Sequence, residues 1–142
     1  MAETDLPTVM ARIRTVLEAA PLSLVATAEG FSHDRQPTTL IDQTYYLEDA
    51  GLVSSRPMGN YKAARIDGIR VYVALRVNDD PHVRKETLES TFLDIERAIK
   101  TDGNAQSYHA EITTGRKVTQ KRGSNVFVGS LGLTVDYDVA EN

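Results

Sequence analysis

The sequence predicts a single α+β domain, in which a mostly antiparallel twisted sheet has two amphipathic helices packed on one face. Three observations predict this fold. Apolar residues recur at helical spacing in segments 7–20 and 81–100. They recur at every second position in segments 66–77 and 125–139, so these strands have one apolar side each. A parallel α/β core would need strands that are apolar on both sides and that alternate regularly with helices.

Length, composition and charge restrict the function. The chain has 142 residues, which fits one domain spanning 1–142. It has no cysteine, which excludes disulfides, thiolate metal sites and cysteine nucleophiles. The formal net charge of −4 disfavours a protein that wraps a DNA duplex, because phosphate neutralisation supplies much of the affinity of such proteins. The first residues are acidic and polar, so we expect no signal peptide, and no apolar run is long enough for a membrane span.

The first helix is expected to begin after Asp5, whose carboxylate can accept hydrogen bonds from free backbone amides. Pro7 suits the first turn and Pro21 ends the helix. Extended segments follow. The expected order is a short strand at 22–28, a loop at 29–38, a strand at 40–47, a turn at 48–51, a weak strand at 52–53 and a loop at 56–60.

The clearest strand is 66–77, where Asp67 and Gly68 indicate a bulge or a tight turn. A second helix begins at Asp80 and Pro81 and continues to about residue 100, and segment 102–104 is expected to close it. Its apolar stripe is Leu88, Phe92, Ile95 and Ile99.

Two strands at 108–119 and 125–139 complete the domain. Gly115 interrupts the first of them. Gly129 and Gly132 lie inside the second and indicate a bend or a close approach of the backbone to another group.

The sequence contains none of the standard catalytic or metal-binding patterns. His33, His82 and His109 fall on separate elements, whereas a metal site needs ligands on converging ones. Ser130 lies in a strand pattern and not on the sharp turn that a nucleophilic serine needs. We therefore expect no metal, no cofactor and no enzymatic activity.

One local feature is basic. Arg116, Lys117, Lys121 and Arg122 lie between the last two strands of an acidic chain. Two readings remain open: a solvated hairpin tip, or a loop that contacts nucleic acid or an acidic partner.

Two segments and the order of elements carry a family resemblance. Segment 65–75, Arg-Ile-Asp-Gly-Ile-Arg-Val-Tyr-Val-Ala-Leu, is an arginine-containing alternating strand that precedes an Asp-Pro helix start. Segment 131–139, Leu-Gly-Leu-Thr-Val-Asp-Tyr-Asp-Val, ends the fold. In this layout the chain resembles the tail-terminator (tail completion) proteins of long-tailed bacteriophages.

The resemblance implies a structural virion protein: a hexameric ring that caps the tail tube, joins it to the neck or head connector and passes DNA through its lumen. Its implied partners are copies of itself, the tail tube protein, a neck or head-closure protein and transient DNA, with no membrane. Its implied location is the virion, and the host cytoplasm during assembly. The loop at 29–38 and the stretch 52–62 have no counterpart that we can assign in that family.

Two groups of residues are candidates for contacts in such a ring. The outer face of the final strand is less polar than a solvated face should be, which predicts a subunit interface. The interface candidates are Val126, Val128, Ser130, Thr134, Arg70 and Tyr72. The candidates for lumen or axial contacts are Arg116, Lys117, Lys121, Arg122, His33, Arg35, Arg56 and Lys62.

Alternative functions remain at this point. A head-closure or adaptor protein of the neck shares the size and style of a terminator. The chain is also compatible with a small nucleic-acid-binding or regulatory module, or with an enzyme whose site residues do not form a pattern in sequence.

Overall fold

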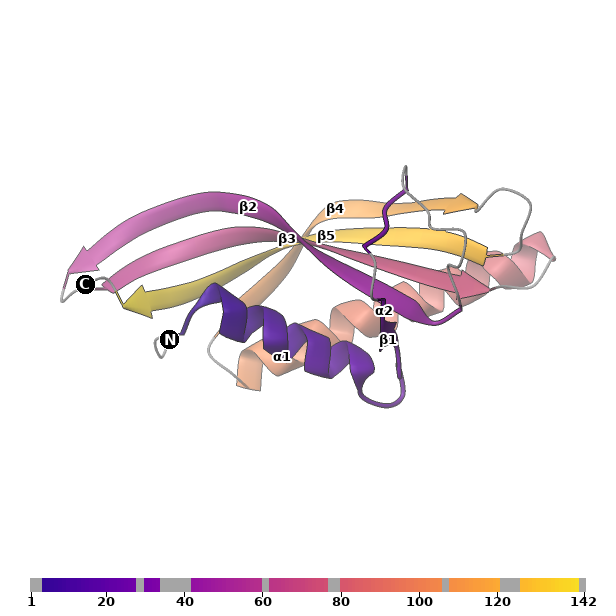
Figure 1. Ribbon diagram of the computed structural model, residues 1–142, viewed down its shortest axis with the longest axis horizontal. Helices are drawn as coiled ribbons and strands as arrows, with labels where there is room; N and C mark the ends of the chain where they lie inside the picture. Colours follow the sequence, from indigo (N-terminus) through magenta and orange to yellow (C-terminus); the bar gives the residue numbers. More distant parts are fainter. Residues whose placement is uncertain are drawn as a thin grey trace.

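The computed structural model describes residues 4–27, 30–33, 42–59, 62–76, 80–105, 108–120 and 126–140. The elements follow as α1 (Leu6–Glu18), β1 (Val25–Ala26), β2 (Thr44–Gly59), β3 (Lys62–Arg76), α2 (Pro81–Ala105), β4 (His109–Gln120) and β5 (Val126–Ala140). The strands form one sheet in the order β1-β2-β3-β5-β4, with β1 parallel to β2 and the other pairs antiparallel. Figure 1 shows both helices beneath one face of this twisted sheet, which confirms the predicted fold class.

The helices form where capping and apolar spacing predict them. The Asp5 carboxylate caps α1 by accepting a hydrogen bond from the Thr8 backbone N–H at 2.8 Å, and the bonds from Thr8 lower the pKa of Asp5. Asp80 caps α2 in the same way, with His82 as the donor at 2.9 Å. The buried residues of the two predicted stripes are Val9, Ile13 and Leu17 in α1 and Leu88, Phe92, Ile95 and Ile99 in α2.

The expected end of α2 at 102–104 is wrong, because the helix continues to Ala105. Gly103 has another role than ending the helix. A Cβ atom at this position would lie 2.9 Å from the backbone oxygen of Tyr108, so the glycine lets the end of α2 pack closely on the chain that leads into β4.

The expected turn at 48–51 and loop at 56–60 are also wrong, since 48–51 and 56–59 fall within β2, and residue 60 lies outside the described residues. The strand shifts register against β3 between Asp49 and Gly51, Leu52 and Ser54, and Pro57 and Gly59. Each shift marks an extra residue, Ala50, Val53 and Met58, in β2. The bulge expected in β3 at Gly68 therefore lies in the neighbouring strand: β3 is regular, and Gly68 pairs with Gly51.

The main core fills the space between the helices and the sheet. β3 contributes Ile69, Val71, Val73 and Leu75, and β5 contributes alternate residues from Phe127 to Tyr137, which confirms both predicted alternations. The close approach expected at Gly129 is confirmed, because a Cβ atom there would lie 2.3 Å from the ring of Phe92. α2 therefore rests with its largest side chain directly on the backbone of β5.

A second, smaller cluster covers part of the opposite face. Phe31, which is 2% exposed, packs there against Tyr72, Ala74, Val126 and Val128. Its ring lies 6.3 Å from that of Tyr72 in an edge-on arrangement. The sheet is therefore covered on both faces at this position, by the helices on one side and by segment 30–33 on the other.

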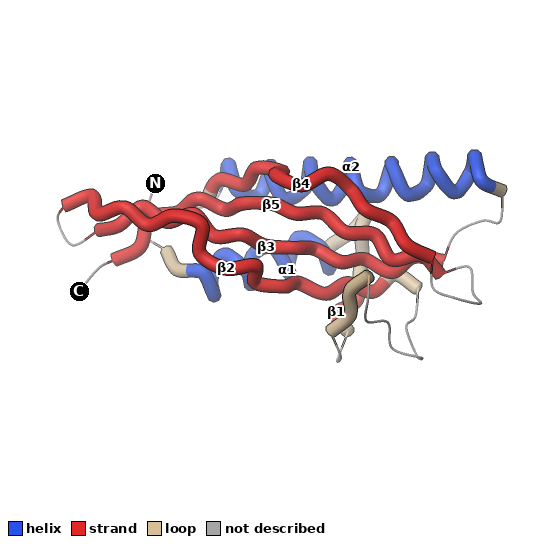
Figure 2. Tube along the Cα trace, turned by 90° about the horizontal axis from the view of Figure 1, so that it is seen from above, coloured by secondary structure: helices blue, strands red, loops and turns tan. Residues whose placement is uncertain are grey.

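The two ends of the molecule differ in shape. In Figure 2 the hairpin of β2 and β3 extends well beyond the helices at one end, close to both chain termini. The beginning of α2 lies at the opposite end, beside the end of β4 and the start of β5. Any contact between these two ends must therefore involve different copies of the chain.

Candidate functional site

Side chains that could bind a metal ion do not converge on one site in the described part of the chain. No group of three or more His, Cys, Asp or Glu residues could hold an ion there. His33 shares a 2.6 Å hydrogen bond with the Ser130 hydroxyl, and His109 lies 3.2 Å from Glu111.

Among the helices described, neither has the length and apolar character to span a membrane.

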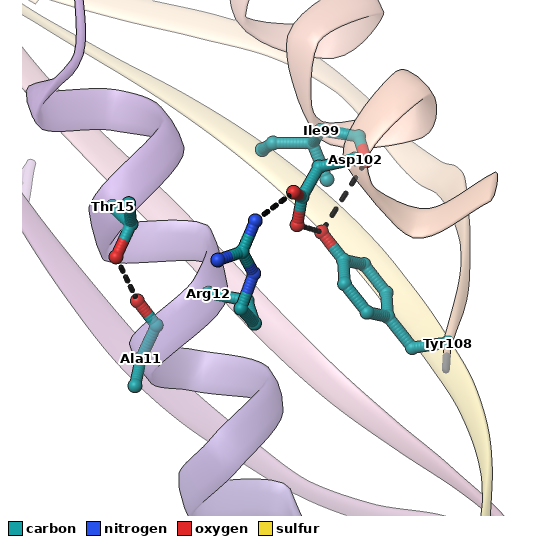
Figure 3. Close-up of polar contacts among 6 residues, drawn as sticks. All are labelled: Ala11, Arg12, Thr15, Ile99, Asp102 and Tyr108. Atoms are coloured by element: carbon teal, nitrogen blue, oxygen red, sulfur yellow. Dashed lines mark hydrogen bonds and ion pairs between the residues drawn. The ribbon is translucent and has the colours of Figure 1, made fainter. Parts of the chain in front are cut away.

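The most developed polar cluster joins three elements (Figure 3). Asp102, in the last turns of α2, accepts a hydrogen bond from the Arg12 guanidinium of α1 at 2.5 Å. Its other oxygen accepts a bond from the Tyr108 hydroxyl at 2.7 Å. Burial and the Asp102 contact raise the pKa of Tyr108, and Asp102 also raises the pKa of Arg12. Two hydrogen bonds to one carboxylate therefore join α1, α2 and the start of β4.

A second buried polar group lies between β3 and β5. The Tyr137 hydroxyl donates to the Asp67 carboxylate at 2.5 Å, and the Arg65 Nε lies 3.9 Å from the same oxygen. Asp67 is 2% exposed, and burial followed by the Asp67 contact raises the pKa of Tyr137. The pairing satisfies a carboxylate that would otherwise be costly to bury.

The most unusual surface is the outer half of β2, which we call the projecting segment and define as residues 52–59. Every residue in it is exposed. Three are large and apolar: Val53 is 64% exposed, Leu52 51% and Met58 49%. Val53 and Met58 are extra residues of two β-bulges, and a bulge turns its side chain away from the regular pleat. The projecting segment thus displays apolar side chains on an edge of the sheet.

A groove of about 350 Å³ lies at the other end of the molecule, and we call it the α2 groove. It is lined by Leu88 and Phe92 of α2, Val118 of β4 and Phe127 of β5, and of these four only Val118 is exposed. Arg84 lies over the Phe127 ring, with its guanidinium carbon 4.8 Å from the ring centre. The groove is therefore an apolar hollow with charged side chains at its rim.

A second hollow, of about 420 Å³, lies beside the projecting segment. Arg56 and Ile66 line it together with the carboxylates of Asp136 and Asp138. Burial raises the pKa of Asp136, while His109 lowers it and Glu111 raises it. Its mixed charges suit a polar contact with another protein.

The structure corrects the reasoning that led to the predicted subunit interface. Val126, Val128 and Tyr72 are 3%, 0% and 5% exposed, because Phe31 of the same chain covers them. Their apolar character therefore has an intrachain cause. Ser130 is bonded to His33 beside them.

The two other interface candidates remain accessible at the surface. Arg70 is exposed and lies 3.7 Å from Glu48, and Thr134 is half-buried. Their part in a subunit contact stays a prediction.

Four of the candidates for lumen and axial contacts that the structure describes lie in strands and not in loops as expected. Arg56 lies within β2 and Lys62 begins β3, so neither belongs to the predicted loop. Arg116 and Lys117 lie within β4, where the register shifts on either side of residue 114 take the place of the expected interruption. His33 lies in segment 30–33, whereas Arg35, Lys121 and Arg122 fall outside the described residues.

Sequence reasoning missed the projecting segment and the α2 groove. The signal for the first was present, because Leu52, Val53 and Met58 are apolar residues within a polar, glycine-containing stretch. The groove depends on three elements that are distant in sequence, and no local pattern identifies it.

Comparison of the chain with models of known protein families and with curated proteins yields no match.

Proposed function

We propose that this chain is a structural subunit that assembles into a ring at the junction between a phage tail tube and the neck, with DNA passing through the ring. The observation that carries the proposal is the projecting segment, whose exposed residues include Val53, Leu52 and Met58. The α+β architecture agrees with the layout on which the resemblance to tail-terminator proteins rests.

The energetic argument concerns apolar surface. Fully burying one side chain such as valine, leucine or methionine stabilises a contact by about 1.5–3 kcal/mol. Two such residues, Leu52 and Val53, are adjacent in the projecting segment and Met58 lies further along the same strand, and the folded chain leaves about half or more of each exposed. Grouped apolar exposure of this kind is typical of a surface that another protein covers.

The charge of the chain suits a passage for DNA. A protein that neutralises many phosphates holds DNA tightly, whereas a net charge of −4 gives no general attraction for the duplex. A ring of such subunits can therefore surround DNA without holding it in place.

Sedimentation velocity over a range of concentrations, with negative-stain imaging, tests the proposal. The unmodified protein is expected to form closed rings. Val53→Asp should dissociate them, because a carboxylate would have to be buried in the contact. Val25→Asp is the matched control, since Val25 is 59% exposed on β1 and lies outside the projecting segment.

Two outcomes would contradict the proposal. The first is an unmodified protein that remains monomeric at every concentration. The second is a ring that Val53→Asp and Val25→Asp leave equally intact, since the projecting segment would then have no part in assembly.

A further inference from the structure

We infer that segment 30–33 is a strap that opens while the rest of the domain stays folded, and that its opening uncovers the apolar face beneath Phe31. We call this the strap face and define it by the buried residues on which Phe31 packs: Tyr72, Ala74, Val126 and Val128. The inference stands independently of the proposed function, because every contact in it lies within one chain.

Side chains, and not a backbone ladder, hold the strap on the sheet. Gly30 and Phe31 lie outside the strands, and neither makes a backbone hydrogen bond to another residue that the structure describes. Phe31 packs on the strap face, and His33 shares a 2.6 Å hydrogen bond with the Ser130 hydroxyl. β3, by contrast, is joined to both of its neighbours by ladders of backbone hydrogen bonds. The strap can therefore leave without disrupting the pairing of β2, β3 and β5.

The strap nevertheless fits closely in its closed position. A Cβ atom at Gly30 would lie 2.7 Å from the ring of Tyr46, so the glycine lets the backbone lie directly against that ring. The Phe31 ring lies 6.4 Å from the ring of Tyr46 and 6.3 Å from that of Tyr72. The closed state is thus a defined arrangement to which the strap can return.

The chain on either side of the strap is fixed to the domain by other contacts. Before the strap, Leu24 is buried in the main core, and its N–H donates to the Leu17 carbonyl at 2.9 Å. After it, the Asp42 carboxylate accepts a hydrogen bond from the Arg76 backbone N–H at 2.6 Å. Of the described residues between these two positions, only β1 pairs with the sheet, and it consists of two exposed residues. Opening therefore leaves the core packed and keeps the strap tethered near its site.

The strap face is continuous and has its own support. Ala74 and Val128 are direct partners across β3 and β5, and the pair Tyr72 and Ser130 lies two positions along the same ladder. The two helices pack on the opposite side of these strands and hold them in place when the strap is open (Figure 1). The projecting segment is exposed at all times, whereas the strap face is accessible only when the strap is released. The strap thus controls when this apolar surface is available.

Labelling of single cysteines tests the inference, because the chain has no cysteine of its own. Val128→Cys places a thiol beneath the strap, and Val71→Cys places one beneath the helices; both valines are 0% exposed. A thiol reagent modifies each position only when its cover opens. We expect Val128→Cys to be labelled at least about tenfold faster than Val71→Cys in the absence of urea, because a local opening is more frequent than global unfolding.

Two further measurements identify the kind of opening. Release of the strap exposes little surface, so labelling at position 128 should rise only slightly with urea, whereas labelling at position 71 should follow the steep slope of global unfolding. Ile95→Val, in the main core, should speed labelling at position 71 by about two- to tenfold and leave position 128 unchanged. Ala74→Cys, which also lies beneath the strap, replaces Val128→Cys if that variant does not fold.

Equal labelling rates with equally steep urea slopes at positions 128 and 71 would overturn the inference, because the strap would then open only when the whole domain unfolds. An effect of Ile95→Val on position 128 as large as on position 71 would overturn it as well. Ring formation is decided separately, since a monomer can open its strap and a ring can form with every strap closed.

Discussion

The two halves of β2 lie in one strand and pair with the same neighbour, yet their surroundings are opposite. In the first half, Thr44, Tyr45 and Leu47 are buried, since α1 and β1 pack around them. In the second half, every residue from 52 to 59 is exposed. The boundary coincides with the first register shift, at Asp49 and Gly51. One strand thus takes part in the core at one end and forms a free surface at the other.

If the chain assembles as proposed, this difference places stability and assembly in separate parts of the molecule. Substitutions in the covered part should change the free energy of unfolding and leave contacts between copies unaffected in the folded fraction. Substitutions in the projecting segment should weaken contacts between copies and leave the free energy of unfolding of the single chain almost unchanged. The following predictions test that separation.

The largest loss of stability is expected at Phe92, in the covered part. Truncating a buried phenylalanine to alanine typically costs about 3–5 kcal/mol. Phe92 is 0% exposed and its ring presses on the backbone at Gly129. Phe92→Ala should lower the free energy of unfolding by this amount in urea denaturation. Gly129→Ala should also destabilise the protein. Its effect should be smaller in the Phe92→Ala background, because the added methyl group then has room. If the effects of the two substitutions were strictly additive, the contact between Phe92 and Gly129 would be contradicted.

A smaller loss is expected at Phe31, which covers the opposite face. Phe31→Ala should lower the free energy of unfolding by about 3 kcal/mol, the low end for such a truncation, because the covering segment can partly close over the gap. The same variant uncovers Val128 and should bind a hydrophobic dye more strongly than Val25→Ala, its exposed control. An effect below about 1 kcal/mol would mean that Phe31 is not what seals this face.

Stability should fall at alkaline pH. Burial raises the pKa of Tyr45 to about 12 and raises the pKa of Tyr108 and Tyr137 as well. The unfolded chain releases these protons near pH 10, whereas the folded protein retains them. Stability is therefore complete below about pH 10 and declines above it, by about 1.4 kcal/mol per pH unit for each retained proton.

Urea denaturation at pH values on either side of this threshold measures the decline. Tyr108→Phe and Tyr137→Phe should each make it shallower, because each removes one retained proton. A decline that these variants leave equally steep would show that other groups cause it.

The smallest effect on stability is expected in the projecting segment. Val53→Ser and Met58→Ser should change the free energy of unfolding by less than about 0.5 kcal/mol, as is usual for exposed positions. Val71→Ser is the matched control, because Val71 is 0% exposed in β3 and its substitution should cost about 2 kcal/mol or more. A loss in the free energy of unfolding at Val53 as large as that at Val71 would contradict the proposed difference between the two halves of β2.

The parts of this fold that could be predicted from sequence are those with a local signal. The alternation around Val71 and the stripe through Phe92 each follow from one periodicity, and both are confirmed. The bulges in β2 could not be separated from turns, because glycine and aspartate favour both. Gly51 has a φ of +100°, a conformation that occurs in turns and in bulges alike.

The candidate site was less accessible to prediction than the fold. An apolar outer face on β5 is equally consistent with a neighbouring subunit and with a covering segment of the same chain. The choice depends on where Phe31 lies, almost a hundred residues before Val128 in the sequence. Both the exposure of Val53 and the α2 groove likewise depend on tertiary arrangement.

The bulges of β2 also determine where the chain tolerates changes in length. β3 is paired on both sides without a shift from Ile69 to Ala74, so losing one residue there would turn every following side chain to the wrong face. Ala50, Val53 and Met58 are already extra residues relative to β3. Removing one of them would make the pairing around it regular. Insertions and deletions should therefore accumulate in β2. Related chains could then alter the proposed contact surface while the pairing of the other strands stays unchanged.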